Sequence, residues 1–257
     1  MNAARLAIVS FVLGGPFGLL GLAEGSGPRA APANVCGLGI LAPSSKVLFV
    51  PGTGGIDALA LFNGKLLWQS QAASTPLLAT DKRVFAQVAV TGKRNRVRVV
   101  ILDALTGESL LTSNTITFPG WVSVQPDYGL RFRSGARLDE GGLLLLWDAR
   151  AFHDGGEPPH DPDPHKKHAG GAVRVDLVTG KVAAVKGYQV NEEDFPPQNG
   201  DARAARAGGW VFQVHETWPE AAFPYTLSRR TLKAESSDHR RRWQHPIAGE
   251  PYLPPRP

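Results

Sequence analysis

Four of the seven histidines in this chain lie within sixteen residues of one another, in a stretch that also carries several carboxylates. They are His153, His160, His165 and His168. Imidazole and carboxylate groups are good ligands for Zn²⁺, Cu²⁺ and Ni²⁺. The prolines between them disfavour a helix that would fix their geometry. The stretch is therefore a candidate metal-binding segment, and the alternative is a flexible polar loop that contacts a partner.

Other residues with chemical potential lack the partners that catalysis needs. His215 and Glu216 could exchange protons, but no nucleophile or metal ligand stands beside them. The glycine-rich stretch 52–55 lacks the Lys-Ser/Thr ending and the following helix of a phosphate-binding loop, which predicts a turn. The sequence therefore assigns no catalytic residue and no cofactor.

The elements that must position these residues are strands. The chain has 257 residues with 29 glycines and 21 prolines, and its apolar residues come in short runs between them. Such punctuation favours strands and turns over helices. Runs at 47–50, 56–62 and 65–68 form a meander, with Asn63-Gly64 as a two-residue turn that tolerates positive φ. The composition predicts an all-β fold.

The meander recurs along the chain. Gly64 and Gly107 are 43 residues apart, which is the period of a four-stranded repeat. A third copy contains Gly180, 73 residues after Gly107, and the excess of about 30 residues is assigned to an inserted loop at about 149–170. A degraded fourth copy runs from 209 to 243, and divergent sequence around 118–146 allows a fifth.

Within these copies, certain residues recur at matching places. They are Asn63, Gly64 and Trp68; Asp103, Thr106 and Gly107; Asp176, Thr179 and Gly180; and Trp243. The pattern resembles the β-propeller repeat of the pyrroloquinoline-quinone type, Ala-Leu-Asp-x-x-Thr-Gly-Lys-x-x-Trp. The resemblance implies a propeller with about four to five four-stranded blades, and the chain length favours an open or incomplete ring.

The resemblance also bounds the function. The family includes quinone-dependent alcohol dehydrogenases, which use a vicinal disulfide and a calcium-bound carboxylate base, and non-catalytic scaffolds such as an outer-membrane assembly lipoprotein. Cys36 is the single cysteine, so a vicinal disulfide cannot form. We therefore interpret the chain as a non-catalytic binding or scaffold protein of the cell envelope. The alternative is a degenerate quinoprotein-type oxidoreductase or another propeller enzyme.

The N-terminus predicts export. Arg5 precedes an apolar stretch, 6–22, that glycines and a proline interrupt, and Gly21-Leu22-Ala23 has small residues where a signal peptidase cuts. We expect a signal peptide at 1–23, a linker at 24–39, a propeller domain at 40–248 and a proline-rich tail at 249–257. The mature protein would be periplasmic or extracellular, and the alternative is an uncleaved N-terminal anchor.

The net charge of +5 comes largely from three basic stretches, 93–98, 131–137 and 229–242. No nucleic-acid-binding motif accompanies them, so the sequence predicts a solvated basic surface and no nucleic-acid partner. The expected partner is another protein or a component of the envelope. An open ring would also allow self-association, because it leaves sheet faces uncovered.

Overall fold

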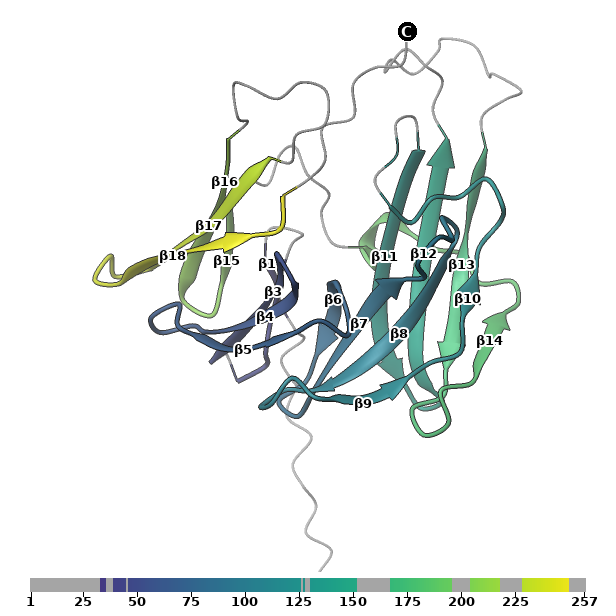
Figure 1. Ribbon diagram of the computed structural model, residues 1–257, viewed down its shortest axis with the longest axis horizontal. Coiled ribbons are helices and arrows are strands. Elements are labelled where there is room, and N and C mark those ends of the chain that lie inside the picture. The colour runs from purple at the N-terminus through teal and green to yellow at the C-terminus, as the bar shows by residue number, and fades with distance from the viewer. Residues whose placement is uncertain are drawn as a thin grey trace, which may run out of the picture.

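The computed structural model describes residues 33–35, 39–44, 46–125, 127, 130–151, 167–195, 204–217 and 228–249. Its strands form four antiparallel sheets, and the described helical structure is a single 3-10 turn, η1 (Glu192–Asp194). In each sheet most strands pair with their neighbours in sequence (Figure 1). This succession of meanders is the architecture that propeller blades share.

The first two sheets have five strands each. The first contains β1 (Ala33–Val35), β2 (Gly39–Leu41), β3 (Val47–Gly52), β4 (Gly55–Ala60) and β5 (Leu66–Ser70). The second contains β6 (Thr75–Ala79), β7 (Arg83–Ala89), β8 (Arg96–Asp103), β9 (Ser109–Thr112) and β10 (Ile116–Thr117). Both β9 and β10 pair with β8, so the second sheet ends in two short strands along one edge.

The other two sheets have four strands each. The third contains β11 (Leu130–Asp139), β12 (Gly142–Ala151), β13 (His168–Val175) and β14 (Val182–Val185). The fourth contains β15 (Ala204–Ala207), β16 (Trp210–Thr217), β17 (Arg229–Ser236) and β18 (Arg242–Ile247). The order of strands across each sheet follows the order along the chain.

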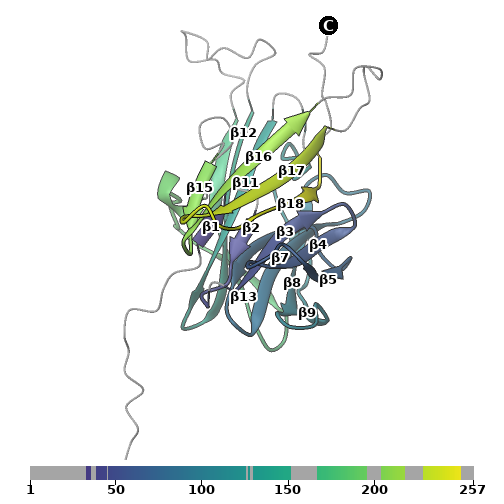
Figure 2. The same cartoon turned by 90° about the vertical axis from the view of Figure 1, so that its left-hand side faces the viewer.

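Three hydrophobic clusters join the sheets in pairs. The first–second cluster includes Phe49, Trp68 and Leu102; the second–third cluster, Phe85, Ile101 and Leu145; and the fourth–first cluster, Leu48, Phe212 and Leu232. The order around the molecule is therefore fourth, first, second, third, and Figure 2 shows the fourth sheet in front of the first. Where strands of the inner sheets are covered on both faces, successive residues are apolar and buried, as in 48–50 and 99–102.

The arc of blades is open between the third and fourth sheets. Among the described residues, no hydrophobic cluster contains members of both. The third sheet's remaining face is covered by the segment after β14, from which Tyr188, Val190 and Phe195 pack against Leu144 and Leu146. The described part of the chain is thus an all-β, propeller-type fold of four blades, and these four do not close a ring.

Several boundaries differ from the sequence-based expectation. The expected linker contains β1, which pairs with β2. The region around 118–146 holds no separate fifth blade, because β11 and β12 are the first two strands of the third sheet. The expected insert at 149–170 begins and ends inside paired strands, with Ala149 opposite Ala169 and Arg150 opposite His168. Small side chains at 169–172 fit a strand as well as a loop.

No helix in the described ranges is both long enough and apolar enough to span a bilayer. The expected signal peptide at 1–23 lies outside the described residues, as do Cys36 and the tail beyond Gly249.

Candidate functional site

The hairpin that links the last two strands of each repeat is built around one side-chain oxygen. In the second sheet, Asp103 Oδ1 accepts hydrogen bonds from the backbone N–H groups of Leu105 and Thr106, at 2.8 and 2.9 Å. Thr106 Oγ1 then accepts from the N–H of Glu108 at 3.3 Å. These bonds to the ionised form lower the pKa of Asp103. The motif therefore shapes the turn, and the carboxylate of Asp103 is engaged in hydrogen bonds within it.

The third and first sheets use the same design with one substitution. Asp176 Oδ1 accepts from the N–H groups of Val178 and Thr179, which lower its pKa. In the first sheet Ala60 stands where the aspartates do, and Asn63 Oδ1 accepts from the N–H of Lys65 at 3.0 Å, as the threonine does elsewhere. Asn63 thus keeps the second half of the motif where the first half is missing.

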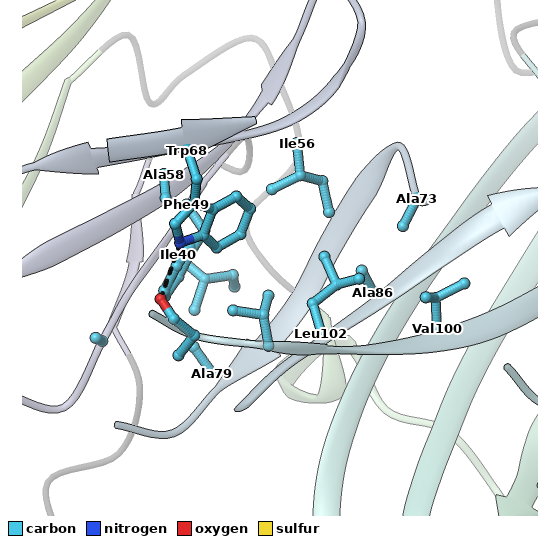
Figure 3. Packing of buried hydrophobic residues seen from close by; sticks show 13 residues of the cluster. Ile40, Phe49, Ile56, Ala58, Trp68, Ala73, Ala79, Ala86, Val100 and Leu102 are labelled. Carbon is cyan, nitrogen blue, oxygen red and sulfur yellow. Dashed lines mark hydrogen bonds between the residues drawn. The ribbon is translucent and has the colours of Figure 1, made fainter. Parts of the chain in front are cut away.

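Trp68 docks the first sheet onto the hairpin of the second. Its Nε1 donates to the carbonyl oxygen of Ala104 at 3.0 Å, and the side chain is buried between the two sheets, with 9 % exposed. The ring lies against Gly107, where an added Cβ would stand 2.5 Å from it. Gly107 has a φ of 75°, which glycine adopts without strain. Figure 3 shows Trp68 beside Phe49 and Ile40 with this hydrogen bond dashed.

Trp243 repeats the arrangement between the last sheet and the first. Its Nε1 donates to the carbonyl oxygen of Leu61 at 2.8 Å, and its ring lies against Gly64. An added Cβ on Gly64 would be 2.6 Å from that ring. The two tryptophans therefore act as equivalent locks, each joining the outer strand of one sheet to the hairpin of the next.

At the junction between the second and third sheets, a leucine occupies the position that Trp68 holds in the first sheet, although Trp121 and Trp147 pack elsewhere in the cluster. Leu111 pairs opposite Ile101 in β8, as Trp68 pairs opposite Ala58 in β4, and its side chain is half-buried. The N–H of Asn114 donates to the carbonyl oxygen of Gly180 at 2.8 Å, which ties the hairpin of the third sheet by backbone alone. The hairpin of the third sheet is therefore held without an indole against it.

A cluster of charged side chains lies where the expected insert leaves the third sheet. Asp148, 2 % exposed, accepts from Arg133 Nε at 3.0 Å and lies 2.6 Å from His168 Nε2. Arg150 Nε is 3.2 Å from the same carboxylate. Burial alone would raise the pKa of Asp148, but its hydrogen bonds with His168 and Arg133, together with the charges of the two arginines, leave that pKa lowered.

Glu192 connects this cluster to the segment that covers the third sheet. It accepts from both terminal nitrogens of Arg133 and from Arg150, and the bond with Arg133 is the main reason that the Glu192 pKa falls to about 2. The Arg133 guanidinium also lies 4.5 Å from the centre of the Phe195 ring. The cluster thus fastens η1 and Phe195 to the sheet with carboxylates that stay ionised at neutral pH.

A second buried carboxylate joins the first and fourth sheets. Asp57, 4 % exposed, accepts from Gln69 Nε2 at 2.7 Å, and its other oxygen lies 2.9 Å from His245 Nε2. Gly52 makes room for it, because a Cβ there would collide with the carboxylate. Both oxygens of Asp57 are therefore engaged, one by Gln69 of the same sheet and the other by His245, which joins the first sheet to the fourth.

Of the four histidines proposed as metal ligands, His153, His160 and His165 lie outside the described residues. His168 is described, and its partner is Asp148. Within the described ranges, no group of three or more histidine, cysteine or acidic side chains could hold a metal ion.

The His215-Glu216 pair is not arranged for proton exchange with a substrate. Glu216 Oε1 accepts from Arg230 Nε at 3.0 Å, while His215 is exposed on a different face of β16. Adjacent residues in a strand point to opposite sides of the sheet, so a sequence pair of this kind is separated by the fold.

The fourth sheet presents an open hollow of about 490 Å³ on the face turned away from the first sheet. It is lined by Val211, Gln213, Lys233, Glu235, Arg242 and Gln244, among others. These positions alternate with the buried ones along β16, β17 and β18, so the hollow belongs to the free face of a terminal sheet. Because this lining includes polar and charged side chains, the face can remain exposed to solvent without a further blade packed against it.

Sequence reasoning missed the charged cluster and the Asp57–His245 pair. Arg133 and Asp148 are opposite in the β11–β12 register. The available signal was the charge of Asp148, which directly follows the apolar run 143–147. Glu192 and His245 come from distant segments, and no local pattern connects them to their partners.

No protein-family model matches this chain, and no curated protein is similar to it in sequence. Among solved structures, the WD40 domain of SCAP from fission yeast is similar over 84% of this chain and 52% of that one, with 10% identity and a TM-score of 0.22. The chain thus spans about half the length of that structure. At this score the likeness bears on neither fold nor function, and the fold rests on the sheets themselves.

Proposed function

We propose that this protein is a non-catalytic binding or scaffold protein of the cell envelope that holds a protein partner. The observation that carries the proposal is the occupancy of its buried carboxylates. Asp57 and Asp148 are each held by two or more side chains, and the lowered pKa of Asp148 keeps it ionised. A general acid needs a raised pKa and access to substrate. Asp57 instead joins the first sheet to the fourth, and Asp148 holds together strands of the third sheet.

The free face of the fourth sheet supplies the surface for a partner. Its hollow combines the amides of Gln213 and Gln244 with the charges of Lys233, Glu235 and Arg242. The lining combines these hydrogen-bonding groups with apolar area from Val211 and Trp243, a mixture that suits a partner that associates reversibly. The repeat resemblance and the export signal expected at 1–23 support an envelope location for this binding.

A photo-crosslinking amino acid at Gln213 tests the partner surface. We expect one dominant crosslinked species in intact cells, because a specific partner contacts this face. The same amino acid at Lys186, exposed beyond β14, is the matched control and should give none. Equal crosslinking from both positions, or none from Gln213, would contradict the assignment of this face as the partner surface.

The enzymatic alternative has its own test. Purified protein is mixed with pyrroloquinoline quinone and Ca²⁺, freed of unbound quinone, and assayed for alcohol-dependent dye reduction. We expect no retained chromophore and no dye reduction. A stoichiometric chromophore with turnover would establish the oxidoreductase instead.

A further inference from the structure

Side chains on the free face of the fourth sheet lie in rows that cross its strands. In the register of β16, β17 and β18, Gln213 stands opposite Lys233, and Lys233 stands opposite Gln244. Residues opposite one another on one face of an antiparallel sheet have Cβ atoms about 4.5–5.5 Å apart. One ammonium group therefore lies between two primary amides, and we name this set the amide–lysine row.

The amide–lysine row is exposed, and its polar groups are unused within the described part of the chain. None of its three side chains makes a hydrogen bond or an ion pair with another described residue. They line the open hollow of this sheet, and in Figure 2 no strand of another sheet lies in front of β16, β17 and β18. The row therefore presents hydrogen-bond donors and a positive charge to a molecule that approaches this face.

The charged groups around the row are mostly basic. The described strands carry four basic side chains on this face, namely Arg206, Arg229, Lys233 and Arg242. The same face carries one acid, Glu235, which is ionised because its hydrogen bonds with His239 and Arg242 lower its pKa. The β17–β18 turn adds the acid Asp238 and the bases Arg240 and Arg241. With every carboxylate counted as ionised, this described face and its turn are positive.

The uncharged side chains on this face distinguish among anionic partners. Trp243 is the aromatic residue that reaches the hollow, and its ring is committed to the junction with the first sheet, where it lies against Gly64. Single-stranded nucleic acids are held largely by stacking on free aromatic rings. The apolar side chains of the face are small, and a lipid surface requires large ones that enter its acyl region. The composition therefore favours the carboxylates of a protein.

We propose that the amide–lysine row binds a carboxylate side chain from an acidic, extended segment of a partner protein. Lys233 supplies the positive charge, and the amides of Gln213 and Gln244 donate N–H groups to the carboxylate oxygens from either side. This inference rests on the proposed function, because it names the chemistry of the partner that the same face would hold.

Several carboxylates are needed, because one exposed ion pair contributes little to affinity. In an extended segment, alternate side chains face the same way and repeat about every 6.5 Å, as the rows of the sheet do. A segment lying along β17 with one carboxylate on Lys233 would bring further acids toward Arg242 in one direction and Arg229 in the other. Alternating acidic residues thus match the basic positions of the face.

Binding of a labelled peptide in which glutamate and threonine alternate tests this chemistry. The full chain is titrated into the peptide, and fluorescence anisotropy reports binding. The same peptide with glutamine in place of glutamate should bind about tenfold more weakly or worse, because it keeps the shape and loses the charge. Binding of the glutamate peptide should also weaken as the salt concentration rises.

Variants of the row separate a built site from general attraction by charge. Lys233→Gln should weaken binding of the glutamate peptide about tenfold, and Gln213→Ala and Gln244→Ala should each weaken it about threefold, since each amide donates a hydrogen bond. Lys186→Gln removes the same charge beyond β14 and is the matched control, which should bind as the parent does. Because all four side chains are exposed, urea unfolding midpoints should remain as in the parent.

Crosslinking in intact cells separates this inference from the proposed function. The photo-crosslinking amino acid is placed at Val211, beside the row, and Lys233→Glu should then abolish the crosslink to the partner. A crosslink that persists in Lys233→Glu would leave the partner surface in place and overturn the carboxylate assignment. Peptide binding as expected, without any crosslink in cells, would support the carboxylate site and contradict the proposed function.

Equal binding of the glutamate and glutamine peptides would overturn the inference, as would equal losses in Lys233→Gln and Lys186→Gln. A single-stranded oligonucleotide and vesicles containing phosphatidylglycerol are measured in the same way. If either binds more tightly than the glutamate peptide, and that binding is lost in Lys233→Gln, the face holds a nucleic acid or a lipid and the protein assignment is wrong.

Discussion

The sheets are joined in two different ways, and the third sheet is the exception. The fourth–first and first–second junctions are each locked by an indole that donates to a backbone carbonyl and covers a glycine, at Trp243 and Trp68. The second–third junction has Leu111 at that place, and the third sheet is secured on its other face by ions around Asp148. The sheets of this repeat are thus stabilised in two ways, by apolar packing of an indole and by ion pairs. The two should respond differently to mutation and to pH.

The largest effect is expected at a tryptophan lock. Trp68→Ala should lower the free energy of unfolding by about 3–5 kcal/mol, because it leaves a cavity and an unpaired carbonyl. Trp68→Phe should lie between, since it keeps the ring but loses the hydrogen bond. Urea unfolding measures both. A loss below about 1 kcal/mol for the alanine variant would contradict the lock.

The glycine under the lock can be tested against a glycine that has nothing above it. Gly107→Ala combines a positive φ with a Cβ 2.5 Å from the Trp68 ring, so we expect a loss of about 2–4 kcal/mol. Gly92→Ala has a similar φ, 70°, but no atom within 4 Å of the added Cβ, and should cost only the backbone strain of about 1–2 kcal/mol. Equal losses from the two variants would mean that the ring does not constrain the hairpin.

Removing the leucine that replaces the lock tryptophan at the second–third junction should cost less. Leu111 is half-buried, so Leu111→Ala should lower stability by about 1–2 kcal/mol in the same urea experiment. The difference between this variant and Trp68→Ala measures how much the indole adds to a junction. A loss as large as that of Trp68→Ala would make the two kinds of junction equivalent.

Acid should loosen the charge-paired sheet first. The Glu192 pKa of about 2 lies below the ordinary 4.5, so the unfolded chain binds the proton more readily than the folded one. The contribution of Glu192 is complete above about pH 4.5 and is lost as the pH falls toward 2. Glu192→Gln should therefore destabilise at neutral pH and show a flatter stability profile below it. Hydrogen exchange of the amides in 188–195 reports this locally, and a profile as steep as that of the parent would argue against the pairing.

The sequence predicted the local features well and the long-range ones poorly. Asn63-Gly64, Asp103 to Gly107 and Asp176 to Gly180 are turns whose geometry depends on residues within the turn, so their patterns can be read directly. His239 escaped notice, because a non-glycine residue at a φ of 58° carries no local signature. The charged cluster and the polar hollow depend on which sheet lies beside which, and periodicity carries no such information.

The lock between Trp243 and Leu61 joins residues 182 positions apart in the chain. During synthesis the first sheet is complete long before the fourth sheet has been made. The face of the first sheet that bears Leu48 and Leu59 therefore stays uncovered until Phe212 and Leu232 can pack against it. Contacts so distant in sequence slow folding, because closing a long loop precedes any gain from the contact. Packing of the fourth sheet against the first is therefore the expected last step of folding. A nascent chain that stalls before residue 210 would expose an apolar sheet to aggregation.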